Sequence, residues 1–317
     1  DQTYKLFKYL KSTNGFNGDW FPIIEDATNN VYEENLVTDK HLQTLRDLIS
    51  GTEIKTKQQS LFDFYDFSII PIEFISNVYE SFIGEDEQSK NGAYYTPTFL
   101  VDYILKYTVD EYFKKNPQEY NCKVLDPACG SGIFLVETLR KLIKQFEKVK
   151  NRKIKPCEIV RLVEDNIFAI DKDRNAILIS VFSIYLTMLD YLDPKDIEQF
   201  VFPYLIQSHK NSSPNFFEND FFDTEATFNT IIKNNKINFI IGNPPYKRGA
   251  GKSKELLHFL KIRSQSENKK IEIGNKEIAQ AFMIRSSDMN EEANISFIVN
   301  SKNFYNLQSK QFRKYFL

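Results

Sequence analysis

The sequence predicts an α/β fold, in which a parallel sheet carries helices on both faces and is preceded by a smaller helical region. From about residue 92 onward, short apolar runs typical of buried strands alternate with longer stretches of helical periodicity. Three of the runs are followed by a polar side chain, namely Asp126, Asp171 and Asn243. Strand–helix alternation favours a parallel sheet, and such sheets bind ligands beyond the carboxyl ends of their strands.

The first part of the chain, residues 1–88, is expected to form the helical region because its apolar residues follow helical periodicity. The polar stretch 85–92 then predicts a boundary, so residues 89–317 are assigned to the sheet domain. Within that domain, helical periodicity predicts helices at 99–113, 133–149, 174–191 and 276–289. Short apolar runs predict strands at 122–125, 167–170, 237–241 and 295–299.

Composition restricts the class of protein. The chain has 317 residues, 42% of them hydrophobic and 26% charged, so a packed core is expected. Because the formal net charge is −2, contact with nucleic acid would have to come from a local basic patch. The three cysteines and three histidines lack paired metal spacing, which predicts no metal site, no disulfide framework and a reducing, cytoplasmic location. The apolar run 176–192 contains polar residues and is expected in the core rather than in a membrane.

The first strand leads into a glycine-containing turn, Asp126-Pro127-Ala128-Cys129-Gly130-Ser131-Gly132. Two glycines at the start of a helix permit a tight turn and a close backbone approach, which suits a nucleotide-like ligand. An Asp ahead of the glycines can accept from an ammonium group. The alternative is a purely structural turn, since two glycines without a third are a weak signal. Cys129 has no histidine near it in sequence, so a catalytic thiol is not expected.

Two further acidic positions follow the turn. Asp171 ends the second strand, where an acid commonly binds ribose hydroxyls, although it could instead cap the next helix. Asp173 could supply that cap, so one residue would be available for each task. Asp220 and Phe221 could bind and cover an adenine ring, and the alternative there is a polar loop with a buried Phe.

The stretch Asn243-Pro244-Pro245-Tyr246 follows a third strand. The Asn243 side chain and the Pro244 carbonyl can together accept both hydrogens of a planar exocyclic amine, and Tyr246 offers a face on which a base can stack. A base in duplex DNA must leave the helix to reach them. A turn followed by a surface Tyr is the alternative. The basic residues Lys247, Arg248, Lys252 and Lys254 are expected to form a loop beside this pocket that contacts phosphates.

The motifs at 126–132 and 243–246 together resemble the γ-class methyltransferases that modify adenine N6 in DNA. The stretch Gly92–Pro97 resembles the first motif of that family, which closes over the methionine part of S-adenosylmethionine, and its position ahead of the other two matches the γ order. The stretch Phe67–Phe82 is similar to the helical lead-in of large single-chain (type IIG-like) restriction–modification proteins. The resemblance implies a Rossmann-like methyltransferase sheet, S-adenosylmethionine as cofactor, S-adenosylhomocysteine as product, and double-stranded DNA as partner.

The resemblance also implies roles for individual residues. Asn243, Pro244, Pro245 and Tyr246 would hold the target base. The residues expected at the cofactor are Tyr95, Thr96, Pro97, Asp126, Pro127, Ala128, Gly130, Gly132, Phe134, Asp171, Lys172, Asp220 and Phe221. Methyl transfer would be an in-line displacement on a sulfonium, driven by positioning and needing no metal.

Three other functions share some of these features. Cytosine-N4 methylation needs the same two acceptors, and methyltransferases acting on a glutamine of release factors share the Asn-Pro-Pro-Tyr motif. A non-catalytic fragment that binds cofactor or DNA is the third. The motif at 92–97 and the order of the motifs favour DNA adenine. Since the chain starts at Asp1 and ends at Leu317, we expect it to be part of a longer protein whose recognition domain, and possibly a nuclease domain, lie elsewhere, so that this part alone could be inactive.

Overall fold

The computed structural model describes residues 25–26, 31–49, 96–197, 200–206, 214–246, 253–265, 273 and 277–316. The chain divides into two compact units, Asp1–Pro71 and Ile72–Leu317. The boundary expected between residues 88 and 89 lies outside the described residues, as does the helical lead-in at 67–82.

The described residues of the first unit form two helices and a small hairpin. Strand β1 (Glu25–Asp26) pairs antiparallel with β2 (Val31–Tyr32), and helices α2 (Glu33–Leu36) and α3 (Asp39–Ile49) follow. Asp39 lies in the first turn of α3, where its charge complements the helix dipole. The expectation of a helical region did not include the hairpin.

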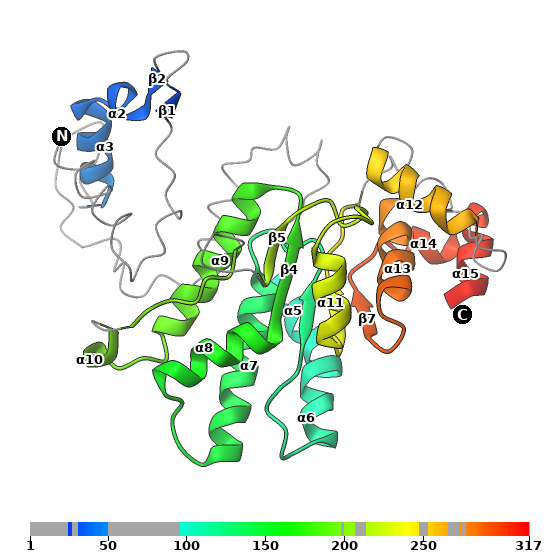
Figure 1. The fold of residues 1–317 in the computed structure, drawn as a ribbon, viewed down its shortest axis with the longest axis horizontal. Coiled ribbons are helices and arrows are strands. Elements are labelled where there is room, and N and C mark those ends of the chain that lie inside the picture. The colour runs from blue at the N-terminus through cyan, green and yellow to red at the C-terminus, as the bar shows by residue number, and fades with distance from the viewer. Residues whose placement is uncertain are drawn as a thin grey trace. The chain divides into compact units, whose positions relative to one another are not determined.

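The second unit is built on a five-stranded sheet whose strands run in the order β5-β4-β3-β6-β7, all parallel (Figure 1). The chain starts at the central strand β3, moves outward to β4 and β5, and then returns to the other side of β3 with β6 and β7. This confirms the predicted α/β fold and places the change of winding direction between β3 and β6. The strands are β3 (Val124–Asp126), β4 (Ile167–Asp171), β5 (Phe216–Glu218), β6 (Phe239–Gly242) and β7 (Asn294–Phe297).

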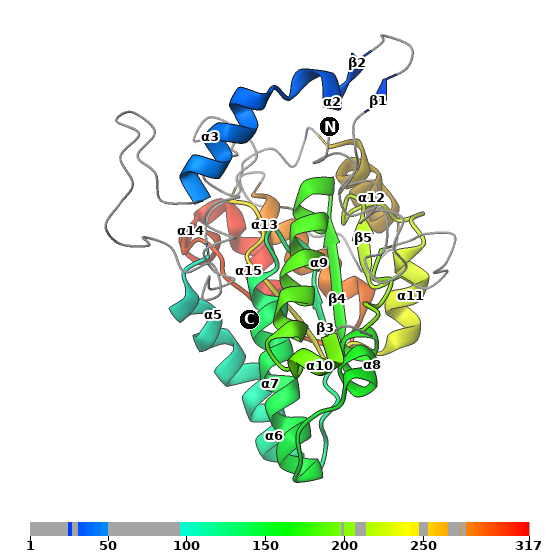
Figure 2. The same ribbon diagram turned by 90° about the vertical axis from the view of Figure 1, so that its left-hand side faces the viewer.

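Helices cover both faces of the sheet (Figure 2). On one face lie α5 (Thr98–Leu105), α7 (Ile133–Lys150) and α9 (Arg174–Leu189), which pack on one another. A π-helical turn, η3 (Lys106–Asp110), joins α5 to α6 (Glu111–Lys115), so the range expected to be helical, 99–113, is helical throughout and contains a π-helical turn. The other helices are α8 (Pro156–Asn166), α10 (Pro194–Ile197), α11 (Phe228–Asn235), α12 (Lys254–Ser264), α13 (Ile278–Met289), α14 (Lys302–Tyr305), the 3-10 turn η5 (Leu307–Ser309) and α15 (Lys310–Phe316).

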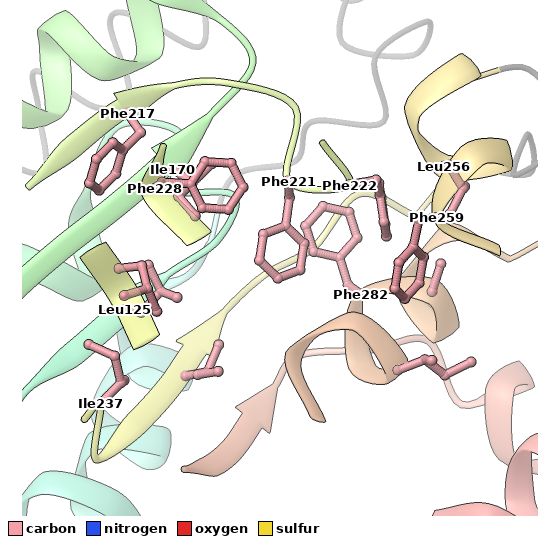
Figure 3. Close-up of a cluster of buried hydrophobic side chains, with 14 of the residues drawn as sticks. Leu125, Ile170, Phe217, Phe221, Phe222, Phe228, Ile237, Leu256, Phe259 and Phe282 are labelled. Carbon is pink, nitrogen blue, oxygen red and sulfur yellow. The ribbon is translucent and has the colours of Figure 1, made fainter. Parts of the chain in front are cut away.

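A large apolar cluster fills the face of the sheet opposite α7 and α9 (Figure 3). Its residues come from the strands and from α11, α12, α13 and α15, so this core joins the late helices to the sheet. The predicted run 176–192 forms α9, which is buried along most of its length. Among the described residues, no helix combines the length and the apolar character that a membrane span requires.

Candidate functional site

Three neighbouring strands end in the polar residues that the sequence singled out. Asp126 closes the central strand β3, Asp171 closes β4 on one side, and Asn243 follows β6 on the other. Because the strands are parallel, all three ends lie at one edge of the sheet, where it changes winding direction. The predicted clustering of these positions is confirmed.

Asp126 is almost completely buried, with 1% of its surface exposed. Its Oδ1 accepts a hydrogen bond of 3.1 Å from the Ala128 N–H. Burial, with a smaller contribution from the nearby Asp171 charge, raises the pKa of Asp126 to about 8, although the hydrogen bond from Ala128 lowers it. Among the described residues no cation contributes to this pKa, so the carboxyl is largely protonated at neutral pH in this structure.

The ends of β3 and β6 are in close contact through Gly242. A Cβ at this position would lie 2.6 Å from Asp126 Oδ1 and 3.2 Å from its Cγ. A side chain at position 242 would therefore force the buried carboxyl of Asp126 or the end of β6 to shift.

The glycine turn after β3 uses left-handed backbone at both glycines, with φ of 53° at Gly130 and 85° at Gly132. A Cβ on Gly132 would lie 2.9 Å from Ser180 Oγ, whereas a Cβ on Gly130 would meet nothing within 4 Å. Ser180 also donates a 2.7 Å hydrogen bond to the Gly130 carbonyl. The turn therefore packs on α9 through Ser180, whereas the space next to the Gly130 Cα is unoccupied by other protein atoms.

Ser180 was not predicted from the sequence. The sequence signal that could have identified it is a serine inside the apolar helix 174–189, and the structure shows that this serine is fully buried. Cys129 is also buried, and burial raises the pKa of its thiol well above the usual value. A thiol held protonated in this way is a poor nucleophile, which agrees with the prediction that Cys129 is not catalytic.

Asp171 links β4 to the glycine turn. Its Oδ2 accepts from the Gly130 N–H at 3.0 Å, and its Oδ1 accepts from the Asp173 N–H at 2.9 Å. Burial raises the pKa of Asp171, while these two hydrogen bonds oppose the increase. Asp173 is the N-cap of α9 and accepts from the Asn175 N–H at 2.9 Å. This confirms that Asp173, and not Asp171, caps the helix, while the ribose contact of Asp171 stays a prediction.

Asp220 and Phe221 follow β5, a strand that the sequence did not predict. Asp220 is partly buried, which raises its pKa, and its Oδ1 accepts from the Phe222 N–H at 2.8 Å. Phe221 has only 3% of its surface exposed and stacks on Phe282, with the ring centroids 5.1 Å apart (Figure 3). In this structure Phe221 is therefore a core residue, as its alternative interpretation supposed, and its contact with an adenine stays a prediction.

The other residues expected at the cofactor are placed as follows. Pro127 and Phe134 are buried, Ala128 is partly buried, and Lys172 is exposed. Thr96 and Pro97 lie at the start of α5, and Tyr95 lies outside the described residues.

Asn243 is held between two other segments of the chain. Its Nδ2 donates to Thr96 Oγ1 at 3.1 Å, and its Oδ1 accepts from the Tyr246 hydroxyl. The same hydroxyl lies 3.2 Å from the carbonyl oxygen of Ile298, which follows β7. Burial raises the pKa of Tyr246 to about 12. These bonds fix the orientation of the Asn243 amide, with Oδ1 as its acceptor.

The target motif also contains two prolines. Pro244 is buried and Pro245 is partly buried, and neither has a backbone N–H. The stacking role expected for Tyr246 stays a prediction, because its hydroxyl is bonded to Asn243 here. Lys254 is exposed at the start of α12, whereas Lys247, Arg248 and Lys252 lie outside the described residues. No cluster of potential metal ligands occurs in the part of the chain that the structure describes.

Two family models match consecutive parts of the chain. The N-6 DNA Methylase model matches residues 71–177, and the Eco57I restriction-modification methylase model matches residues 165–317, so the two matches overlap at 165–177. The glycine turn lies in the first match, Asp171 in both, and Asp220 and Asn243 in the second.

Two curated relatives agree with these models. The type II restriction enzyme and methyltransferase RM.Eco57I of Escherichia coli is 27% identical over 218 residues, covering 57% of this chain and 22% of that protein. The type II methyltransferase M.BanIII of Aneurinibacillus aneurinilyticus is 26% identical over 185 residues, covering 56% of this chain and 27% of that protein. The chain therefore spans about a quarter of the length of these relatives.

Solved structures with a similar fold come from restriction–modification enzymes. The type IIL enzyme MmeI in complex with DNA superposes with a TM-score of 0.58 at 16% identity, covering 99% of this chain and 44% of that one. The ATP-dependent type ISP enzyme LlaBIII bound to DNA gives a TM-score of 0.55 at 16% identity, covering 98% and 22%. Over residues 71–317 the chain is thus similar to two models of DNA methylases, and its two motifs lie at adjacent strand ends.

Proposed function

We propose that this protein transfers a methyl group from S-adenosylmethionine to N6 of an adenine extruded from double-stranded DNA. The observation that carries the proposal is the Asn243 amide, which Thr96 orients by accepting from Nδ2, so that Oδ1 is the acceptor of the amide beside Pro244 in the chain. This pair lies on the strand beside Asp126, so a base bound at Asn243 and a ligand bound at the glycine turn would meet at one edge of the sheet.

The residues at the glycine turn fit S-adenosylmethionine, a methyl donor of the kind that the family requires. Asp126 is a buried carboxyl without a cation, and the ammonium group of the ligand would supply one. The backbone beside Gly130 is open, so a ligand can approach it closely. Asp171 carries carboxylate oxygens that can also accept from ribose hydroxyls. Asp220 would address the adenine of the ligand.

When bound, the cofactor supplies an electrophilic methyl group on a sulfonium. The protein's own contribution is to position the target amine. Asn243 Oδ1 and the Pro244 carbonyl would accept the two amine hydrogens, which draws the nitrogen lone pair out of conjugation with the ring. The nitrogen would then take the methyl group as the bond between sulfur and the methyl carbon breaks, leaving S-adenosylhomocysteine, and the amine would lose one proton. Holding both reactants in line in this way converts a bimolecular reaction into an effectively unimolecular one.

The target pocket must rearrange before an adenine can enter. In the structure, the Tyr246 hydroxyl donates to Asn243 Oδ1, which is the atom proposed to accept from the base. Tyr246 must therefore move its hydroxyl away, and its ring then becomes available for stacking on the extruded base. Because the hydroxyl satisfies Asn243 while no base is present, the partly buried acceptor is never left without a donor.

The wider context of the reaction is also a proposal. The relatives are named as restriction enzymes and methyltransferases of type II systems, which supports a role in restriction–modification for this protein. Recognition of the DNA sequence, and cleavage if it occurs, would be carried out by other domains of the same protein. Residues 1–88 would form a separate helical region ahead of the catalytic domain at 89–317.

The test is to incubate the protein with isotopically labelled S-adenosylmethionine and unmethylated bacterial DNA, and to identify the modified nucleoside by mass spectrometry. We expect N6-methyladenine. Asn243→Ala should abolish transfer while leaving cofactor affinity nearly unchanged. Asn116→Ala is the matched control, because Asn116 is also a partly buried amide but caps α6. N4-methylcytosine as the product, or wild-type turnover by Asn243→Ala, would refute the proposal.

A further inference from the structure

The segment that follows β7 leaves the sheet beside the target motif. The Ile298 N–H donates to the Gly242 carbonyl at 3.0 Å, which extends the pairing of β7 with β6 by one residue. The Ile298 carbonyl is 3.2 Å from the Tyr246 hydroxyl. The chain therefore passes Tyr246, the partner of Asn243, immediately before it enters α14, which lies beside α13 beyond β7 (Figure 1).

A buried glutamine holds two points of the next segment, residues 300–309, which comprises α14, η5 and the residues beside them and which we call the clamped loop. Gln280 on α13 donates from Nε2 to Asn303 Oδ1 at 3.1 Å and to Ser309 Oγ at 2.8 Å. Gln280 and Ser309 are 0% exposed and Asn303 is 1% exposed. A buried polar network whose members are satisfied specifies a single conformation, so the backbone of this loop is held firmly.

Two apolar side chains project into solvent from between these anchors. Tyr305 and Leu307 are 83% and 87% exposed, the highest values for large hydrophobic side chains in the described part of the chain. Ordinary surface apolar residues pack part of their area on neighbours, but here the clamp presents a Tyr and a Leu with almost none covered. Such a rigid presentation fits a surface that binds a partner.

The charge around the loop indicates which partner. Between residues 293 and 317 the sequence contains four basic residues and no acidic residue, a local charge of +4 in a chain whose net charge is −2. Lys302, Lys310 and Lys314 are exposed. Phosphates are the natural complement of such a segment, and continuity with the Asn243 pocket places it where duplex DNA must lie during base extrusion.

We propose that the clamped loop is a DNA-contacting element of the target site, with Lys302 at a phosphate and Tyr305 and Leu307 against bases beside the extruded adenine. Extrusion leaves the neighbouring bases unstacked, and apolar side chains that cover them offset part of the lost stacking. This inference rests on the proposed function. It adds a role in extrusion for residues that contact neither the methyl donor nor the target amine.

The role in extrusion is tested by measuring kcat/KM for methyl transfer to two DNAs. In one DNA the target adenine is paired, and in the other it lies opposite a mismatch, which makes extrusion easier. Tyr305→Ala and Leu307→Ala should each lower kcat/KM about tenfold on paired DNA and less than twofold on mismatched DNA. Tyr107→Ala is the control, because Tyr107 is also exposed but lies on η3. Equal losses on both DNAs, or no loss on either, would overturn the inference.

The phosphate contact is tested separately, by the dependence of duplex binding on salt concentration in fluorescence anisotropy. Lys302→Ala should weaken binding to all duplexes alike and reduce the slope of log Kd against log salt by about 1. Lys115→Ala, an exposed lysine on α6, should leave the slope unchanged. This measurement needs no methyl transfer. A wild-type protein that binds duplexes but transfers no methyl group would therefore refute the proposed function, while an unchanged slope in Lys302→Ala would refute the clamped loop.

Discussion

Replacing Asp126 by Asn should change how the stability of the protein depends on pH. Burial raises the pKa of the Asp126 carboxyl from 3.8 to about 8, so the folded protein binds this proton more tightly than the unfolded chain does. Unfolding between these two pH values therefore releases a proton, and the free energy of unfolding falls by about 1.4 kcal/mol for each pH unit. From pH 5 to pH 7 this group alone lowers stability by about 3 kcal/mol. The side chain of Asn has no such proton, and its amide oxygen can still accept from the Ala128 N–H.

The measurement is urea unfolding of wild type and Asp126→Asn at pH 5 and pH 7, compared as the difference between the two proteins. That difference should move in favour of Asp126→Asn by about 3 kcal/mol on going to pH 7. Asp165→Asn, an exposed acid on α8, should track wild type and serves as the control. A difference between wild type and Asp126→Asn that is the same at both pH values would show that the buried carboxyl has an ordinary pKa.

Three further changes test other contacts of the site. Asp171→Ala removes the acceptor of the Gly130 N–H and a proposed ribose contact, and calorimetry should show S-adenosylmethionine binding weakened by about 1–3 kcal/mol; unchanged affinity would remove Asp171 from the site. Thr96→Val leaves the Asn243 amide without its orienting oxygen and should lower the rate of transfer about tenfold, whereas Thr96→Ser should restore it; a slow Thr96→Ser would show that the hydroxyl is not what matters. Gly242→Ala places a methyl group 2.6 Å from an oxygen of the buried Asp126 carboxyl and should lower the free energy of unfolding in urea by about 1–3 kcal/mol. An unchanged free energy of unfolding would show that the ends of β3 and β6 separate freely.

The sheet could be predicted because its strands are short buried runs with polar residues at their ends. Asp126, Asp171 and Asn243 share one edge as expected, since parallel strands bring their carboxyl ends together. Strand β5 could not be predicted in the same way, because only Phe216–Glu218 is in the strand and the sequence before it is rich in Asn and Ser. The π-helical turn η3 could not be predicted either, because the apolar periodicity of residues 99–113 does not distinguish it from an α-helix.

The contacts between distant segments could not be found from local patterns. The bond between Thr96 and Asn243 joins residues 147 positions apart, and the role at the cofactor that the resemblance implies for Thr96 stays a prediction. The buried bonds of Gln280 likewise depend on how α13 and the clamped loop pack. The burial of Phe221 in the core could not be predicted either, because the position of an aromatic residue after a strand does not indicate which side of the sheet its ring will face.

The contact between Gly242 and Asp126 makes the two halves of the site mutually dependent in evolution. One residue belongs to the strand that carries the target motif and the other to the strand that carries the glycine turn, and the space between them admits no additional carbon atom. Within the methylase family, a larger residue at the position of Gly242 should therefore occur only where the position of Asp126 holds a shorter side chain. The two motifs, separated by more than a hundred residues of sequence, would then be inherited as a matched pair, and exchanging one of them between family members would fail unless the other is exchanged with it.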